Sequence, residues 1–219
     1  MVSKTRIDDV YNAINNLKKL CDYAIENGAS RAKFFDADAV VVDERVRLKC
    51  QVPLCPSYGI NLCCPPKNTP SVEEFRSMLA NYNYAILIQV DTPMSEKLAN
   101  IIQSNESVGE IYENQSYFEN RKDTLDKGQI NLHRLVNKVE AKAYSMGFYF
   151  ATGFIGGSCK LCSKCITQQS GKTCKHPFQA RPSIEAVGID AFKTAKNIGF
   201  ELAPPKNNLV RWTGLILVD

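Results

Sequence analysis

The chain has 219 residues, of which 44% are hydrophobic, and its 27 basic and 23 acidic side chains leave a formal net charge of +4. That length can bury one well-formed core. No run of five or six like charges occurs, so we expect no nucleic-acid partner. No stretch approaches the roughly 20 apolar residues of a membrane span, and the first residues lack the pattern of a secretory signal. We therefore expect a cytoplasmic protein that does not bind membranes.

Nine cysteines are the chemically informative residues of this chain. Thiols stay reduced in the cytosol, and an odd count fits a disulfide framework poorly. Eight of the nine fall in two short windows, 50–64 and 159–174. The ninth, Cys21, lies on the apolar stripe of a predicted helix and should be a small core residue. The two windows therefore predict metal binding.

Hydrophobic periodicity predicts alternating helices and strands along the chain. Residues 104–128 are polar and carry no clear pattern. Helices are expected at 7–26, 71–80, 95–103, 129–146 and 183–198, and strands at 32–42, 46–49, 84–90, 148–154 and 209–218.

This alternation predicts an α/β fold, a mixed sheet flanked by helices, with cysteine-rich metal-binding loops. We expect a single domain over residues 1–219, with metal-binding loops at 50–66 and 157–177. The predicted strand 148–154 runs through Gly156 and Gly157 directly into Cys159. The second loop should thus lie at the carboxyl end of a strand, where open α/β sheets usually bind ligands.

The second window reads Cys159-x2-Cys162-x2-Cys165-x8-Cys174, with Pro177 three residues later. Two-residue spacing lets one loop supply three corners of a cubane, as in bacterial ferredoxins, and Cys174 is near enough to be the fourth ligand. Closed zinc sites more often pair two Cys-x2-Cys knuckles. The spacing therefore favours one or two [4Fe-4S] clusters, with zinc as the alternative.

The first window reads Cys50-x4-Cys55-x7-Cys63-Cys64 and leaves two arrangements open. Adjacent side chains such as Cys63 and Cys64 diverge, so both should not reach one cubane. In one arrangement a late cysteine of each window crosses to the other cluster, as in two-cluster ferredoxins. In the other, Cys50, Cys55 and Cys64 hold a cluster with one open iron, and Cys63 is a bystander.

The chain resembles an uncharacterised prokaryotic family of predicted metal-binding proteins, from about residue 40 to the C-terminus. The resemblance implies metal, with iron–sulfur as the expected form, and gives no reaction. It implies that the position of Cys63 is not a fixed cysteine, which favours the bystander arrangement. The motifs that carry it are Lys49-Cys50-x4-Cys55-Pro56-x-Tyr58-Gly59-x-Asn61-x2-Cys64-Pro65-Pro66, Gly157-x-Cys159-x2-Cys162-x2-Cys165-x8-Cys174-x2-Pro177 and Arg181-Pro182-Ser183-x-Glu185-Ala186-x-Gly188-Ile189-Asp190.

Two residues near the second loop are candidates for contacts with the cofactor. Arg181 could offset cluster charge or hold an anionic substrate, and His176 could ligate or hydrogen-bond beside a cluster. His133, in the predicted helix 129–146, is expected to be a surface or partly buried residue. The expected metal ligands are Cys50, Cys55, Cys64, Cys159, Cys162, Cys165 and Cys174.

Three functions follow from these sites. The first is cytosolic electron transfer or redox chemistry with a redox partner protein. The second is an enzyme that uses the open iron of a three-cysteine cluster on a small-molecule substrate. The third is a structural zinc-binding interaction module. In each case we expect the two windows, 95 residues apart between Cys64 and Cys159, to meet in space.

Overall fold

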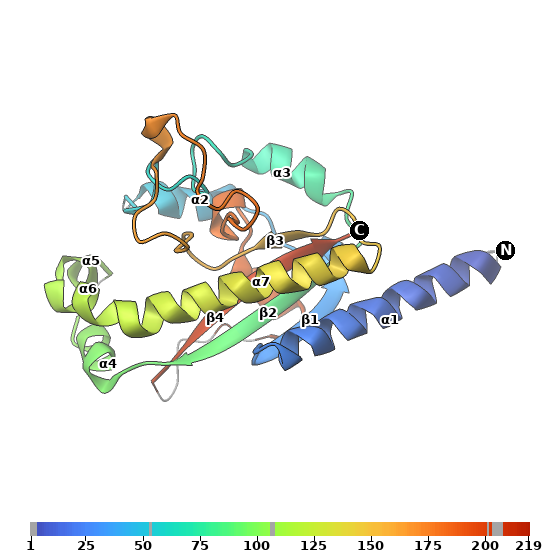
Figure 1. Cartoon of the computed structure of the whole chain (residues 1–219), viewed down its shortest axis with the longest axis horizontal. Coiled ribbons are helices and arrows are strands. Elements are labelled where there is room, and N and C mark those ends of the chain that lie inside the picture. Colours follow the sequence, from blue (N-terminus) through green and yellow to red (C-terminus); the bar gives the residue numbers. More distant parts are fainter. Residues whose placement is uncertain (1–3, 53, 106–107, 201, 203–207) are drawn as a thin grey trace.

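The computed structural model describes residues 4–52, 54–105, 108–200, 202 and 208–219, and it is built on a four-stranded sheet (Figure 1). The strands lie in the order β1-β2-β4-β3, and each neighbouring pair is antiparallel. The mixed α/β fold is thereby confirmed, with antiparallel strands in the sheet and a parallel bridge beyond it, between Ile155 and Ser183. The strands are β1 Arg31–Asp36, β2 Tyr84–Pro93, β3 Thr152–Phe154 and β4 Leu209–Val218.

The two central strands form the longest pairing, from Tyr84 opposite Val218 to Pro93 opposite Leu209. Their apolar residues are buried because helices or loops cover both faces of the sheet. A continuous apolar run is typical of such a strand. The predictions of strands at 84–90 and 209–218 are both confirmed.

Helices α1 (Lys4–Glu26) and α7 (Lys127–Ser145) lie across one face of the sheet (Figure 1). Their apolar stripes meet Ile86, Ile88 and Ile216 in the larger hydrophobic cluster. The helices predicted at 7–26 and 129–146 are confirmed. Cys21 is buried in the same cluster, as expected for a core cysteine.

The opposite face is covered by α3 (Val72–Leu79) and by irregular segments of the chain. Phe75 of α3 meets Phe154 of β3 edge to face, with ring centroids 5.5 Å apart. The helix begins at a capping box, in which Ser71 Oγ accepts from the backbone N–H of Glu74 at 3.1 Å. The reciprocal bond, from Ser71 N–H to Glu74 Oε2, is 2.7 Å long. The helix start at this capping box is therefore confirmed.

A smaller cluster forms beyond the amino end of α7. Leu98, Tyr117 and Leu125 are buried in it. The helix predicted at 95–103 is confirmed as α4, and the segment without a clear pattern forms further short helices. These elements are α4 Glu96–Gln103, α5 Val108–Glu113, α6 Gln115–Arg121 and a π-helical turn Lys122–Asp126.

The strand expected at 46–49 is wrong, because this segment lies in helix α2 (Glu44–Gln51). Asp43 caps the helix, since its Oδ1 accepts from Arg45 N–H at 2.9 Å. A short side-chain acceptor at the N-cap outweighed the valine in the pattern. The strand expected at 32–42 also ends early: β1 stops at Asp36 and a 3-10 turn, Ala37–Ala39, follows.

The helix expected at 183–198 is instead two short helices, the 3-10 turn Glu185–Val187 and α8 (Ala191–Asn197). Gly188 separates them with a φ of 84°, and a Cβ there would lie 2.9 Å from a Val72 methyl carbon. Asp190 then caps α8 by accepting from Lys193 N–H at 3.0 Å. Left-handed backbone at a glycine is a common helix end.

The strand expected at 148–154 is shorter than predicted, because β3 covers only Thr152–Phe154. Phe148 packs into the larger core cluster instead of pairing in the sheet. The chain leaves β3 through Gly156 and Gly157 and enters the second cysteine window. Among the described residues, no helix is both long enough and apolar enough to span a membrane.

Candidate metal centres

The two cysteine windows meet, as the sequence predicts. Asn61 Nδ2 donates to the carbonyl of Cys159 at 3.0 Å. Gln168 Nε2 donates to the carbonyls of Asn61 at 2.8 Å and of Cys64 at 2.6 Å. Figure 1 shows the second window, in orange, beside the chain that follows α2. Residues about 100 positions apart are thus joined through side-chain amides.

Gln168 makes two of these three hydrogen bonds, and sequence reasoning missed it. It lies in the 3-10 turn Gln168–Ser170 and is buried in spite of its polar side chain. A buried amide needs partners, because its desolvation otherwise costs free energy. The sequence around it, Thr-Gln-Gln-Ser, gives no signal that separates Gln168 from its exposed neighbour Gln169.

A cavity of about 440 Å³ is bordered by Cys50, Cys55 and Cys64, and we call it the three-cysteine cavity. Cys50 lies in the last turn of α2, and the carbonyl of Cys50 accepts from Cys55 N–H at 3.0 Å. The rest of the lining comes mainly from the segments around α2 and between β3 and α8. It consists of Val46, Lys49, Ser57, Tyr58, Pro65, Gly157, Ser158, Ser183, Glu185, Ile189, Asp190, Ala191 and Phe192.

The thiols of Cys50 and Cys64 favour their neutral form when no metal is bound. Burial, and then the neighbouring thiols of Cys55 and Cys50, raise the pKa of Cys64 to about 12. Burial, Cys55 and the Glu185 carboxylate raise the pKa of Cys50. A metal must therefore displace protons here. Glu185 Oε2 is itself buried, with no hydrogen-bond partner among the described residues.

A second, much smaller cavity of about 20 Å³ lies in the other window, and we call it the five-cysteine pocket. Four of its cysteines come from the second window, and Cys63 comes from the first. Its lining is Asn61, Leu62, Cys63, Cys159, Leu161, Cys162, Cys165, Cys174 and His176. Cys63 and Cys64 thus point to different cavities, as expected for adjacent side chains.

This placement changes the interpretation of Cys63. It does not stand apart from the sites as a bystander would, because it lines the five-cysteine pocket. The crossing is one-way among the described residues, since no cysteine of the second window lines the three-cysteine cavity. Cys63 thus lies where the crossing arrangement would place it, and Cys50, Cys55 and Cys64 lie together at the other cavity.

Cys63 and Cys159 interact directly in the five-cysteine pocket. The hydrogen bond from the Cys63 thiol lowers the pKa of Cys159, and the Leu161 backbone N–H acts in the same direction. Hydrogen bonds to a thiolate favour the charged form. Cys159 is therefore prepared to ligate a metal as a thiolate.

His133 is only 1% exposed, so the expectation of a surface or partly buried residue is wrong. From α7, His133 faces the segment that follows the second window, where its Nε2 lies 2.8 Å from the carbonyl oxygen of Gln179. A carbonyl only accepts, so Nε2 carries the proton. Nδ1 is buried without a hydrogen-bond partner in the described part of the chain.

The two candidate cofactor contacts have different surroundings. His176 lines the five-cysteine pocket, and its backbone N–H donates to Cys174 Sγ at 3.3 Å. Arg181 lines neither cavity. Its guanidinium pairs with both carboxylate oxygens of Glu140, with Nε–Oε2 at 2.8 Å, and Glu140 also accepts from Gly153 N–H at 2.6 Å. Arg181 thus ties the end of the second window to α7 and β3.

The turn from β3 into the second window needs glycine. Gly157 has a φ of 71°, and a Cβ there would lie 2.6 Å from Gln129 Nε2. That amide donates to the carbonyls of Gly156 at 3.0 Å and Ser158 at 2.6 Å. Gln129 is buried on α7 and was also missed by sequence reasoning, because a helix pattern does not mark a buried amide as functional.

None of the nine cysteines forms a disulfide. Among the described residues, no three histidine, cysteine, aspartate or glutamate side chains converge closely enough to hold a single metal ion. The thiols instead line the walls of two cavities.

Comparison with known proteins gives a family and no activity. No curated protein and no solved structure matches the chain. A family model, described as predicted metal-binding protein (DUF2284), matches residues 33–218, which include both cysteine windows and all four strands except the first two residues of β1. The chain belongs to this family of predicted metal-binding proteins.

Proposed function

We propose that this protein is a cytoplasmic iron–sulfur protein with two cysteine-held [4Fe-4S] centres that acts in electron transfer or redox chemistry. Cys50, Cys55 and Cys64 would hold one centre. Four of the five cysteines Cys63, Cys159, Cys162, Cys165 and Cys174 would hold the other. Soft thiolates are the usual protein ligands of such clusters.

The spacing of the cysteines along the chain supports iron–sulfur over zinc. Closed zinc sites usually pair two Cys-x2-Cys knuckles. Cys159, Cys162 and Cys165 instead stand at consecutive two-residue intervals, which lets one loop supply three corners of a cubane.

The observation that carries the proposal is the contrast between the two cavities. Five thiols enclose about 20 Å³, whereas three thiols border about 440 Å³. The first arrangement suits a closed, electron-carrying centre. The second leaves room beside the metal.

The volume of the three-cysteine cavity favours a second candidate function, an enzyme that acts on a small molecule. A cluster with three protein ligands supplies an open iron that can act as Lewis acid or redox centre. Ile189 and Phe192 give the cavity apolar walls that reduce the access of water. The partnerless Oε2 of Glu185 is the atom at which the chain could hold or accept a proton.

Anaerobic purification followed by metal analysis and visible spectroscopy tests the proposal. We expect iron with acid-labile sulfide and a broad visible absorption that dithionite bleaches. A colourless protein that contains stoichiometric zinc would overturn it. The enzyme candidate requires one further result. Cyanide should change the electron paramagnetic resonance (EPR) signal of the three-cysteine centre. That signal is identified as the one that is lost in Cys64→Ser.

A further inference from the structure

The charges of the chain are divided between the two cysteine-bearing segments and the rest. Residues 45–72 and 141–184 contain ten of the 27 basic residues and none of the 23 acidic residues. These 72 residues therefore carry a charge of +10, whereas the other 147 carry −6. The modest net charge of +4 hides this division.

Four lysines of the second segment lie within two residues of a cysteine that lines the five-cysteine pocket. Lys160, Lys164 and Lys175 are each directly adjacent in sequence to a cysteine of the pocket, and Lys172 lies two residues before another. Lys164, Lys172 and Lys175 are exposed, and Lys160 is half-buried. Arg181 does not belong to this group, because Glu140 neutralises it.

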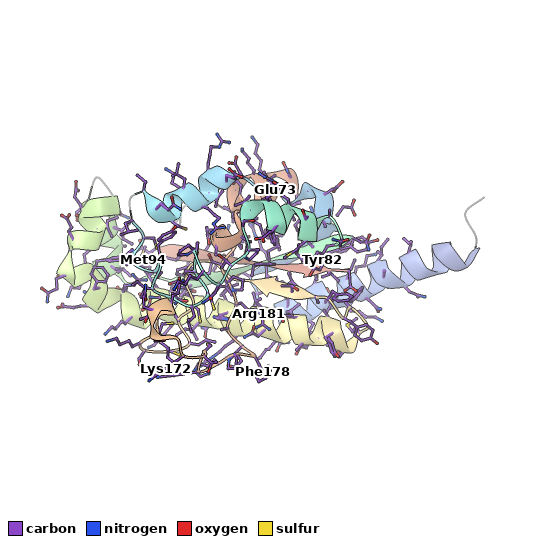
Figure 2. All side chains as sticks on the ribbon, turned by 90° about the horizontal axis from the view of Figure 1, so that it is seen from above. Glu73, Tyr82, Met94, Lys172, Phe178 and Arg181 are labelled. Atoms are coloured by element: carbon purple, nitrogen blue, oxygen red, sulfur yellow. The ribbon has the colours of Figure 1, made fainter. Side chains whose placement is uncertain are left out.

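An exposed aromatic side chain accompanies these lysines. Phe178 follows the last cysteine of the window by four residues and is 90% exposed. Figure 2 shows Lys172 and Phe178 at the same edge of the molecule. We call Lys160, Lys164, Lys172, Lys175 and Phe178 the lysine face. An apolar anchor with a charged, solvated rim is the usual composition of a protein interface.

We propose that the lysine face is the docking surface for a small acidic electron-carrier protein that exchanges electrons with the five-cysteine centre. The inference rests on the proposed function and adds the place and charge of the partner. Opposite charges raise the encounter rate and orient the partner. Since three of the lysines adjoin pocket cysteines, a partner held by them lies next to this centre.

The same lysines could instead only offset the negative charge of a bound cluster. That role would be visible in the reduction potential and not in the encounter with a partner. Exposed ammonium groups act weakly on a buried centre because water screens them. Steering of an acidic protein remains effective over roughly 10 Å at about 0.1 M salt.

The test is stopped-flow electron transfer from a reduced, acidic two-cluster ferredoxin to the iron-loaded protein, followed by cluster bleaching. Raising the salt from about 0.01 M to about 0.3 M should slow the second-order rate by roughly tenfold. The variant K172Q/K175Q should lose several-fold of the low-salt rate. The matched control K18Q/K19Q removes the same charge from exposed lysines of α1 and should keep the wild-type rate.

Each possible failure has its own signature. If dithionite bleaches no cluster, the proposed function fails before docking is tested. If dithionite bleaches the cluster but the rate of electron transfer from ferredoxin changes neither with salt nor in K172Q/K175Q, the docking proposal is wrong. A shift in midpoint potential without a change in salt dependence assigns the lysines to charge compensation. Tight, salt-sensitive binding of a DNA or RNA duplex, with no electron transfer from ferredoxin, would assign the face to nucleic acid and also overturn the proposal.

Discussion

Cysteine sulfurs line both the three-cysteine cavity and the five-cysteine pocket, but different structural elements carry these cysteines. In the first, Cys50 stands on the last turn of α2, and Cys55 and Cys64 follow on the turns behind it. In the second, an irregular loop carries four cysteines and receives a fifth, Cys63, from the other window. One site is left open beside a cavity and the other is closed by a distant residue.

The difference shows how tertiary contacts decide the accessibility of a site. The closure of the pocket depends on the bonds from Asn61 and Gln168, which hold the two windows together. The backbone N–H of Gln168 adds a bond to the carbonyl of Ile60 at 3.0 Å, and Gln169 Nε2 donates to the carbonyl of Gly59. The openness of the other site depends on the break at Gly188, because the segment that follows it lines the cavity.

The largest expected effect is the loss of the closed centre in Cys159→Ser. We expect the iron content to fall by about half and stability to drop by several kcal/mol, since structural metal binding contributes on the order of 10 kcal/mol to folding. Anaerobic thermal melts should show a decrease in Tm of about 10 °C or more. Ser163→Ala, at an exposed position of the same loop, is the control and should melt like the wild type.

Substituting the two adjacent cysteines separately should remove different centres. Cys64→Ser should abolish the signal of the open centre and leave the other, whereas Cys63→Ser should perturb the closed centre alone. EPR spectra of the dithionite-reduced proteins distinguish the two signals. If both variants altered one and the same signal, the division of these cysteines between two cavities would be wrong.

Gln168→Ala tests the link between the sites. Its side-chain amide donates to buried carbonyls, so the variant should lose about 2 to 3 kcal/mol in free energy of unfolding. Urea denaturation of the anaerobic protein measures this loss. Gln169→Ala also removes a hydrogen bond between the windows, from Gln169 Nε2 to the Gly59 carbonyl, but at an exposed position, so it should cost less than about 1 kcal/mol. Equal losses would contradict a clamp specific to Gln168.

The smallest effect is the pH dependence of thiol alkylation in the metal-free protein. Since the thiolate is the reactive form, Cys159, with its lowered pKa, should react near neutral pH at a rate that changes little as pH rises. The pKa of Cys64, raised from 9.0 to about 12, predicts a slow reaction that accelerates about tenfold per pH unit below that value. Iodoacetamide labelling followed by mass spectrometry measures both rates. Parallel titration of both near 9.0 would contradict these environments.

Much of the fold could be predicted from the sequence, because its signals are local. The helices at 7–26 and 129–146 and the strands at 84–90 and 209–218 follow from periodicity alone. The errors also have local causes. Asp43 caps a helix in the segment where Val46 suggested a strand. Gly188 divides into two a helix whose apolar stripe looked continuous.

The sites could be predicted only in part. Cysteine spacing identified the two windows and led to the expectation that they meet in space. It did not show which cavity Cys63 enters, because that depends on contacts made across about 100 residues. Asn61 stood out only as part of a motif, whereas Gln129 and Gln168 resembled ordinary polar residues until burial gave them partners. Arg181 lay near the right loop, yet its partner, Glu140, lies on a helix 41 residues away.

The most direct test of the account is the iron and acid-labile sulfide content per chain of anaerobically prepared wild type, Cys64→Ser and Cys159→Ser. Two [4Fe-4S] centres predict about eight iron and eight sulfide ions in the wild type and about four of each in either variant. A wild type with one zinc ion per site and no sulfide would contradict the central claim. So would one substitution that removes all the iron while the other removes none.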